Sequence, residues 1–146
     1  MLLLANSGGY GLLAKAGDMV GRNRGGKAFL ALDAPEQLLP PVSVEATHTQ
    51  VACLAGDGRL LVYALDELKL QPGGGKGLTL MDVDAAAPLL SVATLAGSLK
   101  VLGSGRGAKP REDLLRGAAL AEYSGRRARK GRKVEGFVKV LRLLAG

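Results

Sequence analysis

The chain has 146 residues, of which 22 are glycine, one is cysteine and one is histidine, and its formal net charge is +7. This length suits one domain or part of a larger repeat array. A single cysteine excludes an internal disulfide, and no apolar run approaches the roughly 18 residues that a membrane-spanning helix needs, so we expect a cytoplasmic protein without a membrane partner.

Two stretches of the sequence repeat each other at a spacing of 48 residues, as Leu12 and Leu60 illustrate. Each stretch contains a short apolar run, an acidic turn, a glycine-rich basic turn and a second apolar run. Self-similarity at such a period is typical of propellers and solenoids, in which each repeat buries its apolar face against a neighbour. The sequence therefore predicts an all-β fold of repeated strand meanders, with one basic turn in each unit.

The expected strands alternate with turns rich in glycine, asparagine and aspartate. In chain order they cover residues 2–6, 10–15, 27–32, 50–54, 59–63, 91–95, 99–102 and 137–144. The Asp57-Gly58 pair between two apolar runs is a strong hairpin signal. Pro35, Pro40 and Pro41 indicate a connection between units, because proline cannot donate to a central strand ladder.

The third unit is more divergent than the first two. We align 91–95 with 50–54 and 99–102 with 60–63, and we interpret 103–124 as an insertion. Acidic residues after Pro110 suit the first turn of a helix, so we expect one short helix between Arg111 and Tyr123. The chain then forms a single repeat domain, 1–146, whose approximate blades are 1–45, 46–90 and 91–146.

The residues that usually build metal or nucleotide sites are scarce. One histidine and one cysteine cannot form the common soft-ligand metal sites, and we expect His48 in a solvated loop and Cys53 in the core. The Gly73–Lys76 run lacks the Ser or Thr and the earlier glycine of a phosphate-binding loop. We expect no catalytic residue, no metal and no cofactor in this chain.

Positive charge is concentrated in one part of the chain. Residues 97–146 contain 13 Lys or Arg against 4 Asp or Glu, whereas residues 1–96 contain 7 against 9. Such asymmetry favours a polyanionic partner, and basic side chains on glycine-rich turns suit phosphate groups. Because no aromatic residues are interleaved, stacking on single strands is disfavoured and duplex DNA is the expected partner. The candidate DNA-binding residues are Arg22, Arg24, Lys27, Arg59, Lys76, Lys100, Arg106, Lys109, Arg111, Arg126, Arg127, Arg129, Lys130, Arg132 and Lys133.

Several of these segments have the pattern of one known family. They are Gly9–Gly11 with 20–28, Gly58–Tyr63 with 65–68, Gly75–Gly77 and Gly125–Gly131. With them the chain resembles the C-terminal domain of the A subunit of bacterial type IIA topoisomerases, that of topoisomerase IV more than that of gyrase. The gyrase box Gln-Arg-Arg-Gly-Gly-Lys-Gly is matched here by Gln71–Gly77, which lacks both arginines, so gyrase-like wrapping is not expected.

The resemblance implies a β-pinwheel, in which four-stranded Greek-key blades exchange strands with their neighbours and a basic outer rim binds and bends DNA. We expect about three blades of a larger array, as a C-terminal fragment of a longer subunit. The implied partners are duplex DNA, the ATPase B subunit, and the rest of the A subunit. The ATP, Mg²⁺ and active-site tyrosine of the holoenzyme belong to other domains. By itself the chain would not be an enzyme; it would support strand passage, decatenation and relaxation near the nucleoid.

Other interpretations of the same sequence remain open. A propeller-like module could use a basic rim to bind acidic protein surfaces, and the equivalent gyrase domain would wrap DNA. The third interpretation, an enzyme in its own right, is the least favoured, because the sequence contains no recognisable set of catalytic residues. An excised arc of blades could also self-associate through its end faces, because terminal blades of repeat proteins expose apolar surface and strand edges. Salt-sensitive affinity for unrelated duplexes separates DNA binding from protein binding.

Overall fold

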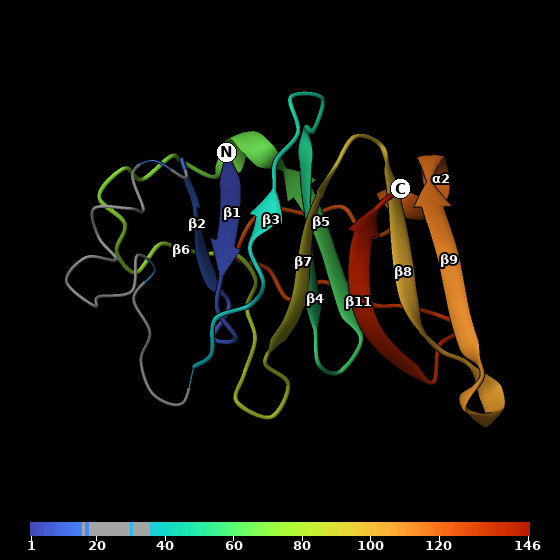
Figure 1. Cartoon of the computed structure of the whole chain (residues 1–146). Helices are drawn as coiled ribbons and strands as arrows, with labels where there is room; N and C mark the ends of the chain where they lie inside the picture. The colour runs from blue at the N-terminus through green and yellow to red at the C-terminus, as the bar shows by residue number, and fades with distance from the viewer. Residues whose placement is uncertain (16, 18–29, 31–35) are drawn as a thin grey trace.

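The computed structural model describes residues 1–15, 17, 30 and 36–146. Three antiparallel sheets follow one another along the chain, from the blue strands on the left of Figure 1 to the orange and red strands on the right. Of the expected strands, 27–32 lies outside the described residues except for Leu30. None of the helices in the described ranges is long and apolar enough to cross a membrane.

Sheet 1 is built on the hairpin at the start of the chain. Its strands, in spatial order, are β3 (Val42–Ser43), β1 (Leu2–Ala5), β2 (Tyr10–Ala14) and β6 (Leu78–Thr79). The turn between β1 and β2 is closed by Asn6, whose Oδ1 accepts hydrogen bonds from the backbone N–H groups of Gly8 and Tyr10 at 3.0 and 3.2 Å. This is the local bonding for which asparagine is favoured in tight turns.

Sheet 2 lies in the middle of the row. Its strands, in spatial order, are β10 (Arg132–Lys133), β5 (Arg59–Ala64), β4 (Gln50–Ala55) and β7 (Leu89–Leu95). The 3-10 turn η1 (Leu65–Glu67) follows β5. Alternate residues of β4 face opposite sides of the sheet, and both sets are buried, because sheet 1 covers one face and sheet 3 covers the other. A strand buried on both faces has a continuous apolar sequence, as Val51–Ala55 has.

Sheet 3 contains three strands among the residues described. In spatial order they are β11 (Lys139–Ala145), β8 (Ser98–Ser104) and β9 (Pro110–Arg116). The hairpin of β8 and β9 carries a 3-10 turn, η2 (Arg106–Ala108), at its tip, and the short helix α2 (Gly117–Ala121) follows β9. The face of β9 turned away from sheet 2 carries the exposed Leu114. The self-association expected from the sequence stays a prediction.

Strands are exchanged between consecutive repeats. β6 follows the hairpin of sheet 2 in sequence but pairs with β2 in sheet 1, where Leu78 lies opposite Gly11. In the same way β10 follows the hairpin of sheet 3 but pairs with β5 in sheet 2, where Arg132 lies opposite Leu60. Each of these two blades is therefore completed by a strand from the following repeat, so the contiguous ranges 1–45, 46–90 and 91–146 do not each contain a whole sheet.

The alignment of the third repeat differs from the sequence-based one. The first strands of the three hairpins begin at Leu2, Gln50 and Ser98, so the 48-residue spacing continues and β8, not 91–95, is the equivalent of β4. Residues 91–95 belong to β7, at the edge of sheet 2. The proposed insertion at 103–124 is also wrong, since it contains β9, the equivalent of β5. Apolar strand runs resemble one another, which is why the alignment slipped by one strand.

A short helix lies within the predicted range of Arg111 to Tyr123, but it is shorter than that range. Residues 110–116 form strand β9, which pairs with β8 along its whole length, and helix α2 begins only at Gly117. The acidic residues interpreted as a helical first turn lie on this strand instead, where Asp113 binds Arg111 two residues away. Seven consecutive strand pairs outweigh the weak local preference for helix.

The three sheets meet along one set of edges, formed by β3, β7 and β11. The backbone N–H of Leu143 in β11 donates to Ser91 Oγ in β7 at 3.1 Å, and Thr94 Oγ1 in β7 donates to the carbonyl of Ser43 in β3 at 3.4 Å. We call this the inner edge and the opposite one, with β6 and β10, the outer edge.

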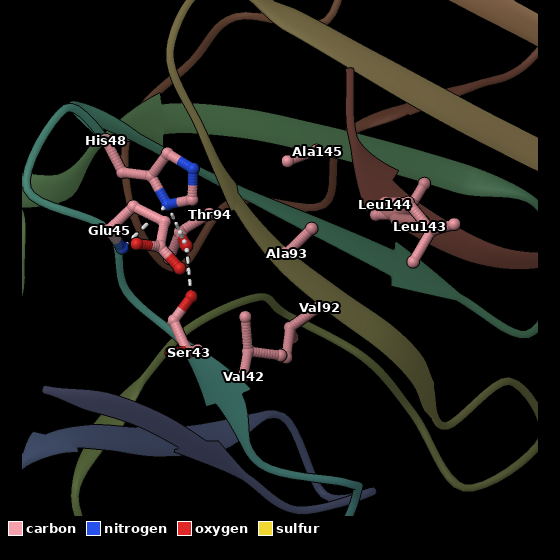
Figure 2. Close-up of a pocket in the computed structure, with 10 residues that line it drawn as sticks. All are labelled: Val42, Ser43, Glu45, His48, Val92, Ala93, Thr94, Leu143, Leu144 and Ala145. Atoms are coloured by element: carbon pink, nitrogen blue, oxygen red, sulfur yellow. Dashed lines mark hydrogen bonds between the residues drawn. The ribbon is translucent and has the colours of Figure 1, made fainter.

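A pocket of about 270 Å³ lies at the inner edge, and Figure 2 shows the strands that line it. His48 lies in the loop between β3 and β4, as expected, but it is half-buried rather than solvated, with its Nδ1 2.7 Å from Thr94 Oγ1. Cys53 is fully buried in the core, as expected.

Candidate nucleic-acid interface

Two loops at the outer edge make equivalent connections. We call residues 71–77 the second-repeat loop and residues 125–131 the third-repeat loop. The first begins where Gln71 N–H donates to Leu13 O at 2.9 Å, and the second begins where Gly125 N–H donates to Val62 O at 2.8 Å. Both loops then lead directly into the exchanged strand, β6 or β10, so the same connection is built twice.

The backbone angles of the two loops match at two positions. Gly74 and Ala128 both have φ of 70°, and Gly77 and Gly131 have φ of 79° and 76°. At the second position glycine is required, because a Cβ on Gly131 would lie 2.6 Å from Leu60 O, and one on Gly77 would overlap Gly11 O. This close approach lets the exchanged strand pair with its neighbour.

The third-repeat loop carries most of the charge at this edge. Arg126, Arg129 and Lys130 are exposed, and Arg132 and Lys133 continue the exposed row along β10. Since β10 is the edge strand of sheet 2, this row borders solvent. We call these five residues the outer-edge cations. Their charge and exposure suit the phosphates of a nucleic acid backbone.

Arg127 differs from its neighbours in the loop because its polar groups have partners within the protein. It is half-buried, its backbone N–H donates to Glu67 Oε1 at 3.1 Å, and its Nη1 donates to Thr79 O at 2.7 Å. These bonds join η1, β6 and the third-repeat loop. Arg127 therefore contributes to the structure of the loop. It is a weaker candidate for direct DNA contact than the exposed Arg126.

The second-repeat loop has a single cation, Lys76. This residue is exposed, and its Nζ lies 4.7 Å from the centroid of the Tyr10 ring, within the range of a cation–π contact. Positions occupied by Arg126 and Arg127 in the third-repeat loop are occupied here by Pro72 and Gly73. The two loops thus share their start, their end and the φ angle at Gly74 and Ala128, but they differ at Gly75, which has φ of 128° where Arg129 has no positive φ, and they differ greatly in charge.

Arg59 lies beside the third-repeat loop at the start of β5, but only 18% of its side chain is exposed. Its Nε donates to both carboxylate oxygens of Asp57, at 3.0 and 2.8 Å, and its Nη1 donates to Lys130 O at 2.8 Å. Partial burial raises the pKa of Asp57, but the hydrogen bonds and charge of Arg59 outweigh this, and the net pKa is below its ordinary value.

A second group of candidates belongs to sheet 3. Arg106 and Lys109 are exposed at the tip of the β8–β9 hairpin, whereas Lys100 is half-buried in the central strand β8. Arg111 in β9 binds the Asp113 carboxylate and the Gly136 carbonyl, and its guanidinium lies 4.9 Å from the Phe137 ring. The hydrogen bond to Asp113 raises the pKa of Arg111. This group is separate in sequence and in sheet from the outer-edge cations.

The remaining candidates, Arg22, Arg24 and Lys27, lie outside the described residues. The DNA-binding role of all the candidate residues stays a prediction. The sequence predicted that Lys76 and 126–133 lie on the basic turns of successive repeats, but it matched the gyrase-like box to 71–77 alone. The structure aligns 71–77 with 125–131 by the starting hydrogen bond and by φ at two positions. The signal was present, because Gly77 and Gly131 each follow a lysine.

Other chemistry is sparse in the part of the chain that the structure describes. No group of three or more His, Cys, Asp or Glu side chains there could hold a metal ion. Cys53 Sγ lies 3.7 Å from Tyr63 Oη in the core. Burial raises the pKa of the Cys53 thiol to about 12, although its hydrogen bond with Tyr63 acts in the opposite direction, and burial also raises the pKa of Tyr63.

The chain has clear similarity to known proteins. It is 33% identical over 147 residues to the A subunit of DNA topoisomerase 4 from Neisseria gonorrhoeae, which covers 95% of this chain and 19% of that protein. It is 31% identical over 153 residues to the corresponding protein of Pseudomonas aeruginosa, which covers 99% of this chain and 20% of that protein. The structure superimposes on the E. coli ParC C-terminal domain with a TM-score of 0.81 and 28% identity, over 97% of this chain and 58% of that one.

The chain belongs to the family of C-terminal domains found in the A subunits of topoisomerase IV. A DNA gyrase A C-terminal domain superimposes with a TM-score of 0.73 at 16% identity, over 99% of this chain and 48% of that one. This second likeness shows the shared fold, and the expected β-pinwheel is confirmed. No protein-family model matches the chain. The chain spans about a fifth of the length of its topoisomerase IV relatives.

Proposed function

We propose that this chain binds duplex DNA through its outer edge without reading base sequence. The observation that carries the proposal is the row of outer-edge cations, held at a sheet edge by a type of connection that occurs twice in the fold. Side chains that contact phosphates position a protein on a duplex but carry no base information. Affinity should therefore vary little between unrelated duplexes of equal length.

We further propose that the bound duplex bends. Equivalent connections at successive blades would guide a duplex along a curved path, as the resemblance to the topoisomerase C-terminal domains implies. Bending 20–30 base pairs costs on the order of 1–6 kcal/mol, which additional phosphate contacts would offset. End-to-end energy transfer in a doubly labelled duplex should rise on binding, and an unchanged signal would argue for a straight path.

In the complete enzyme this domain would support strand passage, decatenation and relaxation. Its partners would be duplex DNA, the ATPase B subunit, and the rest of the A subunit; its location would be the nucleoid. The catalytic residues and the ATP and Mg²⁺ requirements would belong to those other parts. Removing the outer-edge cations from a complete A subunit should lower decatenation while leaving DNA cleavage at the active site.

Binding of supercoiled plasmid and unrelated linear duplexes over a salt series tests the proposal. The logarithm of the affinity should fall linearly with the logarithm of salt concentration, with a slope of about −0.9 for each phosphate neutralised. A protein-interaction module with a basic rim, the alternative function, would show no salt-dependent affinity for duplex DNA. That result would overturn the proposal.

A further inference from the structure

Arg59 was among the candidate DNA contacts, but its guanidinium is occupied within the protein. Besides the bonds to Asp57 and to Lys130 O, its Nη1 also donates to Asp82 O at 3.3 Å. The side chain thereby joins the β4–β5 turn, the segment after β6 and the third-repeat loop. These bonds use three of the five guanidinium N–H groups, and only 18% of the Arg59 side chain is exposed, so it is less available to a phosphate than the exposed side chains of Arg129 and Lys130.

The two carbonyls that Arg59 contacts lie on segments that also bind each other. Asp82 N–H donates to Arg129 O at 2.9 Å, and Ala128 N–H donates to Leu80 O at 3.2 Å. Arg59 is therefore placed across a junction where the third-repeat loop is held against the segment 80–82. Arg129 and Lys130 supply backbone carbonyls to this junction and leave their cationic side chains exposed.

The equivalent residue of sheet 1 contacts the equivalent lysine. Arg59 lies opposite Lys133 in the ladder of β5 and β10, and Tyr10 lies opposite Thr79 in the ladder of β2 and β6. The Tyr10 ring lies under Lys76, which precedes β6 by the same number of residues as Lys130 precedes β10. The first residue of the second hairpin strand thus contacts the lysine of the next repeat's loop in both blades.

We infer that Arg59 is a positioning residue that holds the third-repeat loop so that Arg129 and Lys130 face the duplex, and that Asp57 fixes Arg59 for this task. The inference rests on the proposed DNA binding. On this inference Arg59 does not contact phosphate, and Asp57, although negatively charged, supports the binding of a polyanion by holding Arg59.

This role predicts the opposite sign from simple electrostatics for the Asp57→Ala substitution. If only charge mattered, loss of a carboxylate near the duplex should strengthen DNA binding. If Asp57 fixes Arg59, its loss should instead weaken DNA binding by roughly threefold. This is about the factor by which a single phosphate contact changes the affinity when the salt concentration rises fourfold. Asp82→Ala is the matched control, because it removes the same charge nearby while keeping the Asp82 carbonyl that Arg59 contacts. We expect Asp57→Ala to weaken binding and Asp82→Ala to leave it unchanged or strengthen it. Stronger binding by both variants would overturn the inference.

Arg59→Lys distinguishes positioning from direct contact. A lysine can still neutralise a phosphate, but it lacks the fork with which Arg59 reaches Asp57 and Lys130 together. Positioning predicts weaker binding by Arg59→Lys, and no further loss when the substitution is added to an Arg129→Gln, Lys130→Gln background. Direct contact predicts near-normal binding by Arg59→Lys, and such a result would refute positioning.

Amide hydrogen exchange without DNA reports the loop itself. Arg59→Lys should speed exchange at the N–H groups of Asp82 and Ala128, and Arg126→Gln should not. Unchanged exchange at both amides would contradict the role of Arg59 even if affinity falls. If the wild-type chain shows no salt-dependent DNA affinity, the proposed function fails. The hydrogen-exchange result still tests whether Arg59 holds the third-repeat loop in place.

Discussion

The second-repeat and third-repeat loops make the same connection with different side chains. Each loop starts with a hydrogen bond to the hairpin of the previous repeat. Each contains a residue with φ of 70° and ends at a glycine in close contact with a neighbouring strand. The second-repeat loop carries one cation, and the third-repeat loop carries four. The comparison separates the positions that the fold requires from those that are free to vary with function.

The glycines that end the two loops should give the largest effects on stability. Gly131→Ala and Gly77→Ala each place a Cβ against a backbone carbonyl at positive φ, and we expect each to lower the free energy of unfolding by about 3 kcal/mol. Gly73→Ala is the control, because open space surrounds Gly73. Urea denaturation measures all three. Equal stability of Gly131→Ala and Gly73→Ala would contradict the close approach at Gly131, and a loss in only one of Gly131→Ala and Gly77→Ala would contradict the equivalence of the two positions.

Neutralising the third-repeat loop should give the largest effect on DNA binding. The variant Arg126→Gln, Arg129→Gln, Lys130→Gln should bind all duplexes on the order of 10- to 100-fold more weakly, with a salt slope smaller by about 2.7. The control Lys100→Gln, Arg106→Gln, Lys109→Gln removes the same charge from sheet 3 and should lose less. Fluorescence anisotropy over a salt series measures both, and equal losses would mean that net charge rather than the outer edge determines affinity.

Adding charge to the second-repeat loop should strengthen binding. Pro72 and Gly73 are exposed, and neither has a positive φ, so arginine fits both positions. We expect Pro72→Arg, Gly73→Arg to bind several-fold more tightly, with a salt slope steeper by about 1 to 2. The pair Pro72→Gln, Gly73→Gln makes the same backbone change without charge. If both pairs bind as the wild type does, the duplex does not reach this loop.

Substitutions at the two residues with φ of 70°, Ala128 and Gly74, should change the free energy of unfolding in opposite directions. Ala128→Gly removes the Cβ strain of the left-handed conformation and should raise the free energy of unfolding by about 1 kcal/mol, whereas Gly74→Ala should lower it by a similar amount. Thermal and urea denaturation measure both. DNA affinity should not change in either variant, since neither carries charge. Shifts of the same sign would show that the two backbones are not equivalent.

The pair of Asp57 and Arg59 should give the smallest effect, because sheet 1 has Tyr10 at the equivalent position. The folded-state pKa of Asp57 is lowered, so the stabilisation is present above the ordinary aspartate pKa of about 3.9 and is lost as pH falls through the folded value. We expect Asp57→Asn to cost less than about 1 kcal/mol near neutral pH, since the carboxylate is half-exposed. The difference in free energy of unfolding between wild type and Asp57→Asn should disappear in acid. A difference that stays constant with pH would contradict a stabilising pair of Asp57 and Arg59.

The fold class, the repeat period and the strongest hairpins can be predicted from the amino-acid sequence alone. Alternating apolar runs and glycine turns act locally, so β1, β2, β4 and β5 lie within one residue of the predicted strands at every boundary. The concentration of positive charge in the last fifty residues was also a property of the sequence alone.

The alignment of the third repeat and the position of the helix depend on contacts between distant parts of the chain. Residues 110–116 have an acidic start that suits a helix, but pairing with β8 makes them a strand. Short apolar strands resemble one another, so only their hydrogen-bonded partners identify which repeat and which sheet they complete.

Tertiary structure also divided the basic residues into different environments. In sequence Arg59, Arg127 and Arg129 are alike, but the first two donate to backbone carbonyls far away in the chain, and the third has an exposed side chain. Charge is a property of the residue, whereas its availability to a phosphate depends on which acceptors the fold places within hydrogen-bonding distance. Those acceptors, Lys130 O and Thr79 O, lie in the third-repeat loop and in the exchanged strand β6, which no local pattern places beside Arg59 and Arg127.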